Sequence, residues 1–382
     1  MRDTDFDEGI MSGATWHKFC DQLKQTGDQI MRPETPTDPR TKAEGFRYLT
    51  RLLRLGLEMH VEFTDPEFPV FFSPCHETMK IGADNPDNFY QMCGLRGDCE
   101  YLIKGHRNTV NYLSFRTQKG GYETDGKMIE CGFFDGKDLI LDADGYFEIT
   151  ISCDRHEGNW LPLDADATAM IVRQTYHDRQ TETCADITIE RINANTKPQP
   201  LRAVEFAQGL MRAADFVTNT SNLFNDWAQS YQAHPNQLPP ADQALCQSVG
   251  GDPNIIYYHS YWELSDQEAW VIDVDRIPDC DTWNFQINNY WLESLDYRYH
   301  RICINKHNAH YNHDGSVTLV LSHHDIGHPN WLTTAGHFKG TCLFRWVGLA
   351  AGEEQCNPTA RKVNIAEIAN LELGSKLVKE KS

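Results

Sequence analysis

The sequence predicts a mainly β protein with helical additions: two antiparallel β-sandwich lobes related by an internal repeat, with an N-terminal helical segment and a long inter-lobe helix. Three observations lead to this fold class. An internal repeat relates residues 144–176 to residues 314–347. Apolar residues alternate with period two on both sides of one long stretch of helical period. The alternating stretches are short and separated by turn residues, which is typical of antiparallel sandwiches rather than βαβ units.

The repeat can be followed residue by residue. Each copy opens with Asp-Gly, runs through an alternating strand, crosses a loop that contains Asn-Trp and ends in a second strand that carries an arginine. Residues 145–152 align with residues 315–322 without a gap. The matched pairs are Asn159 with Asn330, Trp160 with Trp331 and Arg173 with Arg345. We therefore expect two copies of one β-unit, of which the second is rich in histidine.

Periodicity and composition divide the chain into five regions. They are an N-terminal helical segment (1–65), a first β-sandwich lobe (66–197), an inter-lobe helix and linker (198–245), a second β-sandwich lobe (246–350) and a polar helical tail (351–382). The tail is predicted to be helical over residues 365–378.

Helical periods mark three helices. Ser12 or Thr15 can cap a helix through residues 16–31, and an apolar stripe at three- and four-residue spacing predicts a second helix at about residues 42–60. Residues 198–232 carry a longer apolar stripe. Because such a stripe cannot stand free in water, this helix is predicted to pack against the lobes.

The strands are predicted from alternation and flanking turn residues. In the first lobe the candidates are 68–72, 100–103, 109–115, 133–141, 145–152, 169–176 and 185–192, with a turn at 105–108. In the second lobe they are 257–264, 268–274, 282–288, 301–304, 315–322 and 340–347.

Composition limits the classes of partner. The net charge of −20 argues against a general binder of nucleic acid or of anionic membranes, because both need a basic surface. The segment after Met1 is acidic, which is unlike a secretory signal, and no apolar run reaches the length of a membrane span. We therefore expect a cytoplasmic protein whose partner is a small-molecule ligand or substrate, and the sequence leaves a homo-oligomer open.

Cofactor motifs are missing from the sequence. The 12 cysteines are scattered without a CxxC pair, and neither GxGxxG after a strand nor GxxxxGK[ST] occurs. No cofactor is expected on this basis, with a divalent metal as the alternative that the histidines leave open.

Half of the 16 histidines fall between His300 and His337. Histidine is the common acid–base group near neutral pH and a common metal ligand. Three interpretations stay open: an acid–base site, a metal site, and a polar loop whose histidines hold backbone groups. The catalytic candidates are His324, Asp325, His328 and His337. The metal-ligand candidates are His323, His324, His328 and His337.

Arg345 lies inside an apolar strand, so its charge must be paired or solvated. One interpretation is a structural salt bridge, which its equivalence to Arg173 favours. The other is a substrate-binding clamp for a carboxylate, sulfate or phosphate. Arg155, in the loop of the first copy, is a second candidate for holding an anionic group.

The stretch 283–300 mixes aromatic rings with amides and carboxylates. Such a stretch can line a ligand cleft, or it can simply pack on the partner sheet. The substrate-binding candidates that it supplies are Tyr290, Trp291, Asp296 and Tyr297.

These residues also carry a resemblance. DGSVTLVLS…HPNWLTTAGHFKGTCLFRW and the upstream NNYWLESLDYR resemble the signature of the DUF1214 family. IGADNPDNFY and GNWLPL resemble the companion, DUF1254-like N-terminal β-lobe of similar chains. The resemblance implies two jelly-roll-like β-sandwich lobes, similar in outline to those of peptide N-glycosidase-like proteins. It supplies no reaction, because the family is one of unknown function.

Two functions remain. The first is a lyase or hydrolase that uses His/Asp acid–base chemistry on a small oxygenated substrate, derived from a lipid, terpenoid or sugar, in a cleft of the second β-lobe. The alternative is a non-catalytic ligand-binding or protein-interaction β-sandwich protein.

Overall fold

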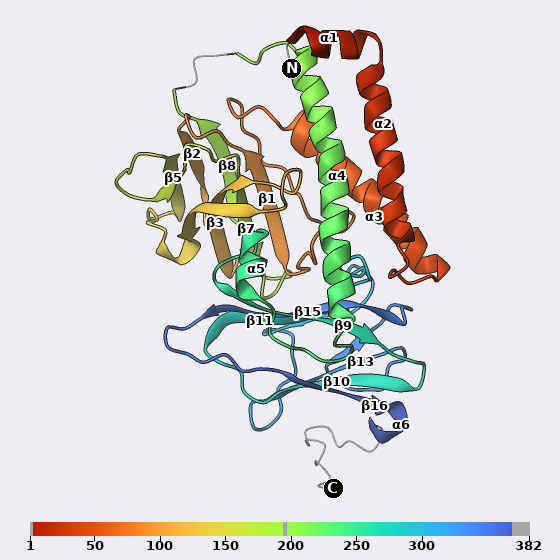
Figure 1. The fold of residues 1–382 in the computed structure, drawn as a ribbon. Coiled ribbons are helices and arrows are strands. Elements are labelled where there is room, and N and C mark those ends of the chain that lie inside the picture. The colour runs from red at the N-terminus through yellow and green to blue at the C-terminus, as the bar shows by residue number, and fades with distance from the viewer. Residues whose placement is uncertain (1–2, 194–196, 369–382) are drawn as a thin grey trace. The chain divides into compact units, whose positions relative to one another are not determined.

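The computed structural model describes residues 3–193 and 197–368 of the chain (Figure 1). Its contacts divide the chain into two compact units, each of which holds two four-stranded sheets. Unit 1 comprises Met1–Ile81, Asp87–Asp226 and Gln247–Gly250. Unit 2 comprises Gly82–Pro86, Trp227–Cys246 and Gly251–Ser382.

The N-terminal part of unit 1 is helical, as the sequence predicts. Its helices are α1 (Asp3–Met11), α2 (Ala14–Thr26) with a 3₁₀ extension (Gly27–Met31), and α3 (Pro39–Leu57) with a π-helical extension (Glu58–Glu62). The long helix α4 (Ala203–Tyr231) runs beside α2, where Gln22 donates to Asp215 at 2.7 Å (Figure 1).

Local chemistry sets where these helices begin. The carboxylate of Asp38 accepts from the backbone N–H of Thr41 at 2.9 Å, and Pro39 fits the first helical turn of α3. The residue before α2 is Gly13, whose φ of 76° suits glycine. Of the two predicted capping residues, Ser12 accepts from the first N–H of the helix, that of Ala14, at 3.4 Å, whereas Thr15 lies inside the helix.

The eight strands of unit 1 form two sheets. The strands are β1 (Asn88–Gly94), β2 (Tyr101–His106), β3 (Tyr112–Gly120), β4 (Met128–Asp135), β5 (Tyr146–Ser152), β6 (Trp160–Pro162), β7 (Ala169–Thr175) and β8 (Asp186–Arg191). Their orders are β1-β7-β3-β4 and β6-β5-β2-β8.

The strands of unit 2 form two further sheets. The strands are β9 (Ile255–Glu263), β10 (Glu268–Val274), β11 (Cys280–Ile287), β12 (Cys303–Asn305), β13 (Val317–Ser322), β14 (Trp331–Thr333), β15 (Lys339–Leu349) and β16 (Thr359–Asn364). Their orders are β12-β11-β15-β9 and β14-β13-β10-β16. Two short helices, α5 (Gln243–Ser248) and α6 (Ile365–Ile368), complete the described elements.

The sheets of unit 2 repeat those of unit 1 strand for strand. Adding eight to each strand number of unit 1 gives the orders of unit 2. Every neighbouring pair is antiparallel except β5–β6 and its counterpart β13–β14, which are parallel. The repeat seen in two sequence stretches therefore extends over all eight strands.

Within each unit the two sheets share one core. In unit 1, Phe115 of β3 meets Phe147 of β5 with ring centroids 6.1 Å apart. In unit 2, Trp270 of β10 meets Phe285 of β11 at 5.9 Å. Each pair joins one sheet to the other, so the apolar faces of the two sheets are buried against each other.

Several local predictions are corrected by the structure. Residues 68–72 form no strand, and Phe72 makes only an isolated bridge. The expected turn at 105–108 begins late, because β2 continues to His106. Residues 359–364, assigned to the helical tail, are the edge strand β16, whose polar sequence is typical of exposed sheet edges. Of the helix expected at 365–378, only residues 365–368 lie among the described residues, and they are helical.

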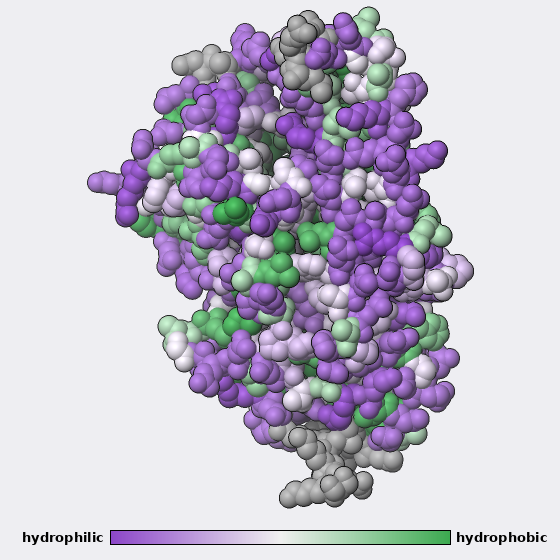
Figure 2. Space-filling view, viewed as in Figure 1, coloured by the Kyte–Doolittle hydropathy of each residue, from purple (hydrophilic) through white to green (hydrophobic). Residues whose placement is uncertain are grey.

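The visible surface is largely hydrophilic. Hydrophilic residues cover most of the face seen in Figure 2, and hydrophobic ones are scattered among them. No helix in the described part of the chain is both long and apolar enough to cross a membrane.

The asparagines of the two Asn-Trp pairs make the same hydrogen bonds in both copies of the repeat. The buried Asn330 side chain accepts from the His310 N–H at 2.7 Å and donates to the carbonyls of His310 and Thr318 at 2.7 and 2.9 Å. Asn159 makes the three equivalent bonds, to the backbone of Ile140 and Glu148. Each asparagine therefore ties a loop to its sheet.

Replacing Asn330 by alanine should lower the free energy of unfolding by about 3 kcal/mol, because buried backbone groups lose their partners. Urea denaturation measures the change. His310→Ala is the matched control, since Asn330 bonds only the backbone of this exposed residue. Equal losses in the two variants would contradict the role assigned to the amide.

Candidate functional site

One sheet face in unit 2 gathers buried polar groups. Along β11, Trp283 and Phe285 point into the core, so the alternating residues Asn284 and Gln286 point to the opposite side. Arg345 on β15 lies opposite Asn284 in register, and therefore shares that side. We call this side of the β12-β11-β15-β9 sheet the polar face.

Arg345 is the centre of the polar face. Only 4% of the residue is exposed. Its guanidinium donates to the side-chain oxygens of Gln286 at 2.6 Å and Asn284 at 3.3 Å, and to the carbonyl of Ala83 at 2.6 Å. All three acceptors are neutral, and among the described residues no carboxylate lies within ion-pair distance of it.

The segment Gly82–Pro86 covers part of this face, within unit 2. Ala83 takes a positive φ of 58°, which costs energy for a residue with a Cβ, and donates its N–H to the carbonyl of Leu292 at 2.7 Å. The next residue, Asp84, accepts from the N–H and hydroxyl of Ser294 at 2.9 and 2.7 Å. These bonds hold the Ala83 carbonyl in front of Arg345.

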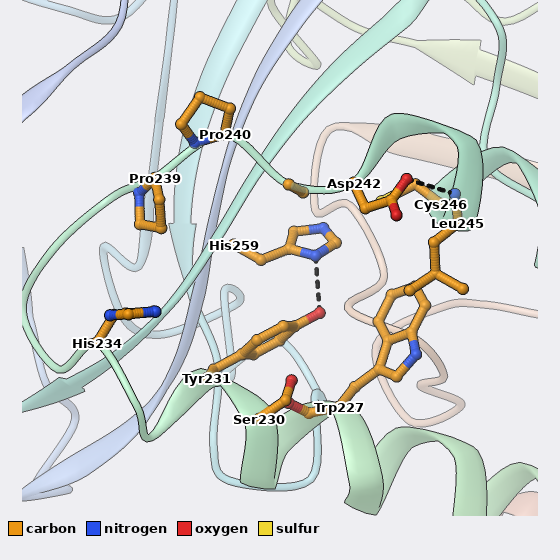
Figure 3. A pocket seen from close by; sticks show the side chains of 11 residues that line it. Trp227, Ser230, Tyr231, His234, Pro239, Pro240, Asp242, Leu245, Cys246 and His259 are labelled. Atoms are coloured by element: carbon orange, nitrogen blue, oxygen red, sulfur yellow. Dashed lines mark hydrogen bonds between the residues drawn. The ribbon is translucent and has the colours of Figure 1, made fainter.

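A cavity of about 250 Å³ opens beside the polar face (Figure 3). It is formed by the last turn of α4, the proline-containing linker, the start of α5 and strand β9. The lining residues are Trp227, Ser230, Tyr231, His234, Pro239, Pro240, Ala241, Asp242, Leu245, Cys246 and His259. All of them belong to unit 2.

The wall of the cavity carries a hydrogen-bonded pair. The hydroxyl of Tyr231 lies 2.7 Å from Nδ1 of His259, as the dashed line in Figure 3 shows. The imidazole is also surrounded by aromatic rings, with centroids 5.6 Å from Trp227 and 5.9 Å from Tyr257. The pair is therefore fixed in place by packing as well as by its hydrogen bond.

The surroundings keep both members of the pair uncharged. Burial, together with the positive charge of Arg345, lowers the pKa of His259 to about 3. Burial also raises the pKa of the Tyr231 hydroxyl well above its usual value. Near neutral pH the pair is thus a neutral imidazole and a protonated phenol.

Such a pair can bind or polarise an oxygen atom. When Tyr231 donates to Nδ1, the ring proton of His259 sits on Nε2. No described residue accepts or donates at Nε2. This N–H is then available as a hydrogen-bond donor to a molecule in the cavity. A low pKa makes the same imidazole a weak base, so proton abstraction does not suit it.

None of the candidate site residues predicted from the sequence lines this cavity. The candidates from the histidine-rich region lie in the segments that follow β13 and β14. His324 and Asp325 are exposed, and Asp325 accepts from the Gly327 N–H at 2.8 Å. His328 accepts from the Asn330 N–H at 3.1 Å, and burial lowers its pKa.

The other two histidines also contact local groups. Nδ1 of His337 lies 3.1 Å from the carbonyl of Thr334. His323 contacts the Thr334 hydroxyl at 2.9 Å and the Leu264 carbonyl at 3.1 Å. Across the described parts of the chain, no three His, Cys, Asp or Glu residues are grouped so that they could hold a metal ion. The four proposed metal ligands are therefore not brought together.

The remaining candidates are spread over both units. Arg155 of unit 1 is exposed and lies 5.7 Å from the centroid of the Trp160 ring. In unit 2, Tyr290 and Trp291 are buried against each other at 5.0 Å. Asp296 pairs with Arg298 at 2.7 Å, and Tyr297 packs on the core. Of all the candidates, Arg345 alone lies on the same sheet face as His259.

The residues that form the cavity carry little signal in the sequence. Tyr231 and Trp227 belong to the apolar stripe of the long helix, a pattern that predicts packing. His259 stands alone among the aromatic residues of β9. The repeat supplies the one signal for His259, because the first copy has a different residue there. Arg173 pairs with Tyr90 as Arg345 pairs with Tyr257. Two residues further along each strand, His259 of the second copy therefore corresponds to Met92 of the first. Strand register was needed to find that equivalence.

Comparisons with known proteins give a family and a near relative. A family model described as "Protein of unknown function (DUF1214)" matches residues 263–346. The crystal structure of a putative uncharacterized protein from Burkholderia cenocepacia is 57% identical, with a TM-score of 0.93 over 96% of this chain and 100% of that one. A Vibrio parahaemolyticus protein is 10% identical, with a TM-score of 0.47 over 83% of this chain and 98% of that one. No curated protein matches the sequence.

The lowered pKa of His259 predicts acid sensitivity. In the unfolded chain His259 is protonated below about pH 6.5, whereas in the folded chain it is protonated only below about pH 3. The free energy of unfolding therefore falls as the pH falls between these values. Between pH 6.5 and 4 we expect His259 to contribute a loss of roughly 3 kcal/mol. Denaturation of His259→Asn over this range should show a shallower decline.

His60 of unit 1 provides the comparison. Burial lowers its pKa to about 4, so it adds its own acid loss, which should persist in His259→Asn and disappear in His60→Asn. A His259→Asn profile parallel to that of the wild type would contradict the buried neutral imidazole.

Proposed function

We propose that the protein binds a small oxygenated organic molecule in the cavity beside the polar face. The proposal is drawn from the geometry of the chain, because the family that residues 263–346 match, DUF1214, has no known function. The observation that carries this proposal is the Tyr231–His259 pair, neutral and hydrogen-bonded, at the wall of an otherwise largely apolar cavity. Binding sites commonly combine an apolar lining with a few placed polar groups.

The cavity supports a particular mode of binding. Trp227, Pro240 and Leu245 offer an apolar lining for the body of the molecule. The Nε2–H of His259 would donate to its oxygen, with Tyr231 fixing the tautomer. The volume of about 250 Å³ limits the molecule to roughly one ring with a substituent.

We propose a lyase or hydrolase as the reaction class. In both classes negative charge develops on a substrate oxygen, and a fixed donor in a water-poor cavity stabilises it. A neutral imidazole can serve as such a donor. The role proposed here for His259 is polarisation of the oxygen, and its low basicity leaves proton abstraction to another group.

Separately, we propose that the group that transfers the proton comes from the histidine-rich loops. His328 is half-buried and therefore more shielded from water than the exposed His324, and burial lowers its pKa. Asp325 and His337 complete the proposed set. None of the four lines the cavity, so this proposal depends on a substrate that reaches the loops by a different route.

Ligand binding without turnover is the alternative, which the weak basicity of His259 favours. For the architecture we infer two jelly-roll-like β-sandwich lobes, supported by the strand-for-strand correspondence. A divalent metal has no support among the residues that the structure describes.

The binding proposal can be tested with neutral single-ring probes, benzyl alcohol and cyclohexanone. Wild-type protein labelled at histidine Cε1 should show a shift of the His259 signal on titration. Tyr231→Phe should weaken binding about tenfold, because the tautomer is no longer fixed. His324→Ala is the control and should bind as the wild type does.

Three outcomes decide between these proposals. Unchanged binding in His259→Phe would place any ligand outside the cavity and refute the proposal. Conversion of cyclohexyl acetate or of a β-hydroxy ketone, lost in His259→Phe, would identify an enzyme. Turnover retained in that variant but lost in His328→Ala would transfer the chemistry to the loops.

A further inference from the structure

We propose that the molecule bound in this cavity carries a carboxylate or a similar small anionic group, whose charge offsets that of the buried guanidinium of Arg345. This inference rests on the proposed function and narrows it from oxygenated molecules in general to organic anions. It is drawn from the surroundings of Arg345 and from its place beside His259.

The guanidinium is a buried cation without an acidic partner. An arginine side chain stays charged in a protein, and an uncompensated buried charge is costly. Arg345 donates to two side-chain amide oxygens and one backbone carbonyl oxygen. These acceptors are neutral, so they satisfy its hydrogen-bond donors but do not neutralise its charge. Buried Arg116 of unit 1 differs, because Glu130 lies 3.5 Å from it. An external anion would supply what the described residues near Arg345 do not.

The cation lies next to the cavity. In register, Arg345 on β15 is opposite Tyr257 on β9, and His259 is two residues further along β9. Arg345 and His259 are therefore diagonal neighbours on the polar face, with Cα atoms about 7–8 Å apart. The charge of Arg345 also acts on Cys246, a second lining residue, since it opposes the rise that burial causes in the thiol pKa.

The acidic groups Asp84, Asp252 and Asp242 hydrogen-bond to other groups and make no direct contact with Arg345. Asp84 accepts two bonds from Ser294, and the buried Asp252 accepts from the Asn254 N–H at 3.0 Å. Asp242 lines the cavity but is exposed, and it accepts from the Leu245 N–H at 3.0 Å. Asp242 would repel an anion from its own side. The anionic group is therefore placed at His259, on the side of Arg345.

The chemical class follows from these constraints. A small monocarboxylate with one ring fits a cavity of about 250 Å³. Its ring would lie against Trp227 and Leu245, and one carboxylate oxygen would accept from Nε2–H of His259. The guanidinium acts over a longer distance, through the low-dielectric interior. Arg345 thus favours a negatively charged ligand without touching it, while His259 makes the direct contact.

The test compares benzoate with benzamide, which share size and shape but differ in charge. Calorimetry on the full chain should show benzoate binding at least about tenfold more tightly than benzamide. Histidine Cε1 spectra should show that benzoate raises the pKa of His259, because an anion stabilises the imidazolium. Arg345→Gln should bring the two affinities within about threefold of each other, and Arg345→Lys should keep the preference.

The outcomes separate this inference from the proposed function. Equal binding of both probes to the wild type, with the His259 signal shifted by each, overturns the anion preference and leaves the cavity function standing. A preference that persists in Arg345→Gln also overturns it. If neither probe shifts the His259 signal, the cavity function fails and this inference fails with it. Should Arg345→Gln not fold, the wild-type affinity ratio and the pKa change decide the question.

Discussion

The polar face of unit 2 depends on the burial of one cation. Arg345 is buried, so the donors of its guanidinium must be met inside the protein. They are met by Asn284 and Gln286 of β11 and by the carbonyl of Ala83, which is distant in sequence. The strained backbone of Ala83 is held in place for this bond. One charged side chain thus fixes a strand pair and a separate segment into a single arrangement.

The same charge shapes the chemistry next to it. His259 is buried and diagonal to Arg345, so its imidazole stays neutral at the pH where an exposed histidine begins to titrate. Tyr231 then has a neutral acceptor at Nδ1. In the proposed function, this pair donates to an oxygen atom of the bound molecule without taking up a proton. The proposed anionic ligand would join the two features, since it would contact His259 and balance Arg345.

The repeat shows which parts are scaffold. Asn159 and Asn330 make the same three bonds in the two copies, and both tryptophans donate to a serine hydroxyl at the end of the preceding strand. The polar face has changed, however. Met92 stands where the second copy has His259. The loop-anchoring bonds are thus common to both copies, whereas the cavity residue His259 is particular to the second copy.

The sequence alone determined the scaffold. Alternation, turn residues and the Asp-Gly and Asn-Trp repeats predicted β-rich halves, N-terminal helices and a long helix, because these depend on local periodicity. The resemblance to DUF1214 is confirmed over residues 263–346. Edge strand β16 escaped prediction because its polar residues lack an apolar face. The roles given to His324, Asp325, His328 and His337 stay predictions. Only the tertiary structure decided which residues share a cavity: Tyr231 ends a helix and His259 lies within a strand, and their 2.7 Å contact depends on strand register and chain path. Local patterns carry neither, because both follow from pairing between distant segments.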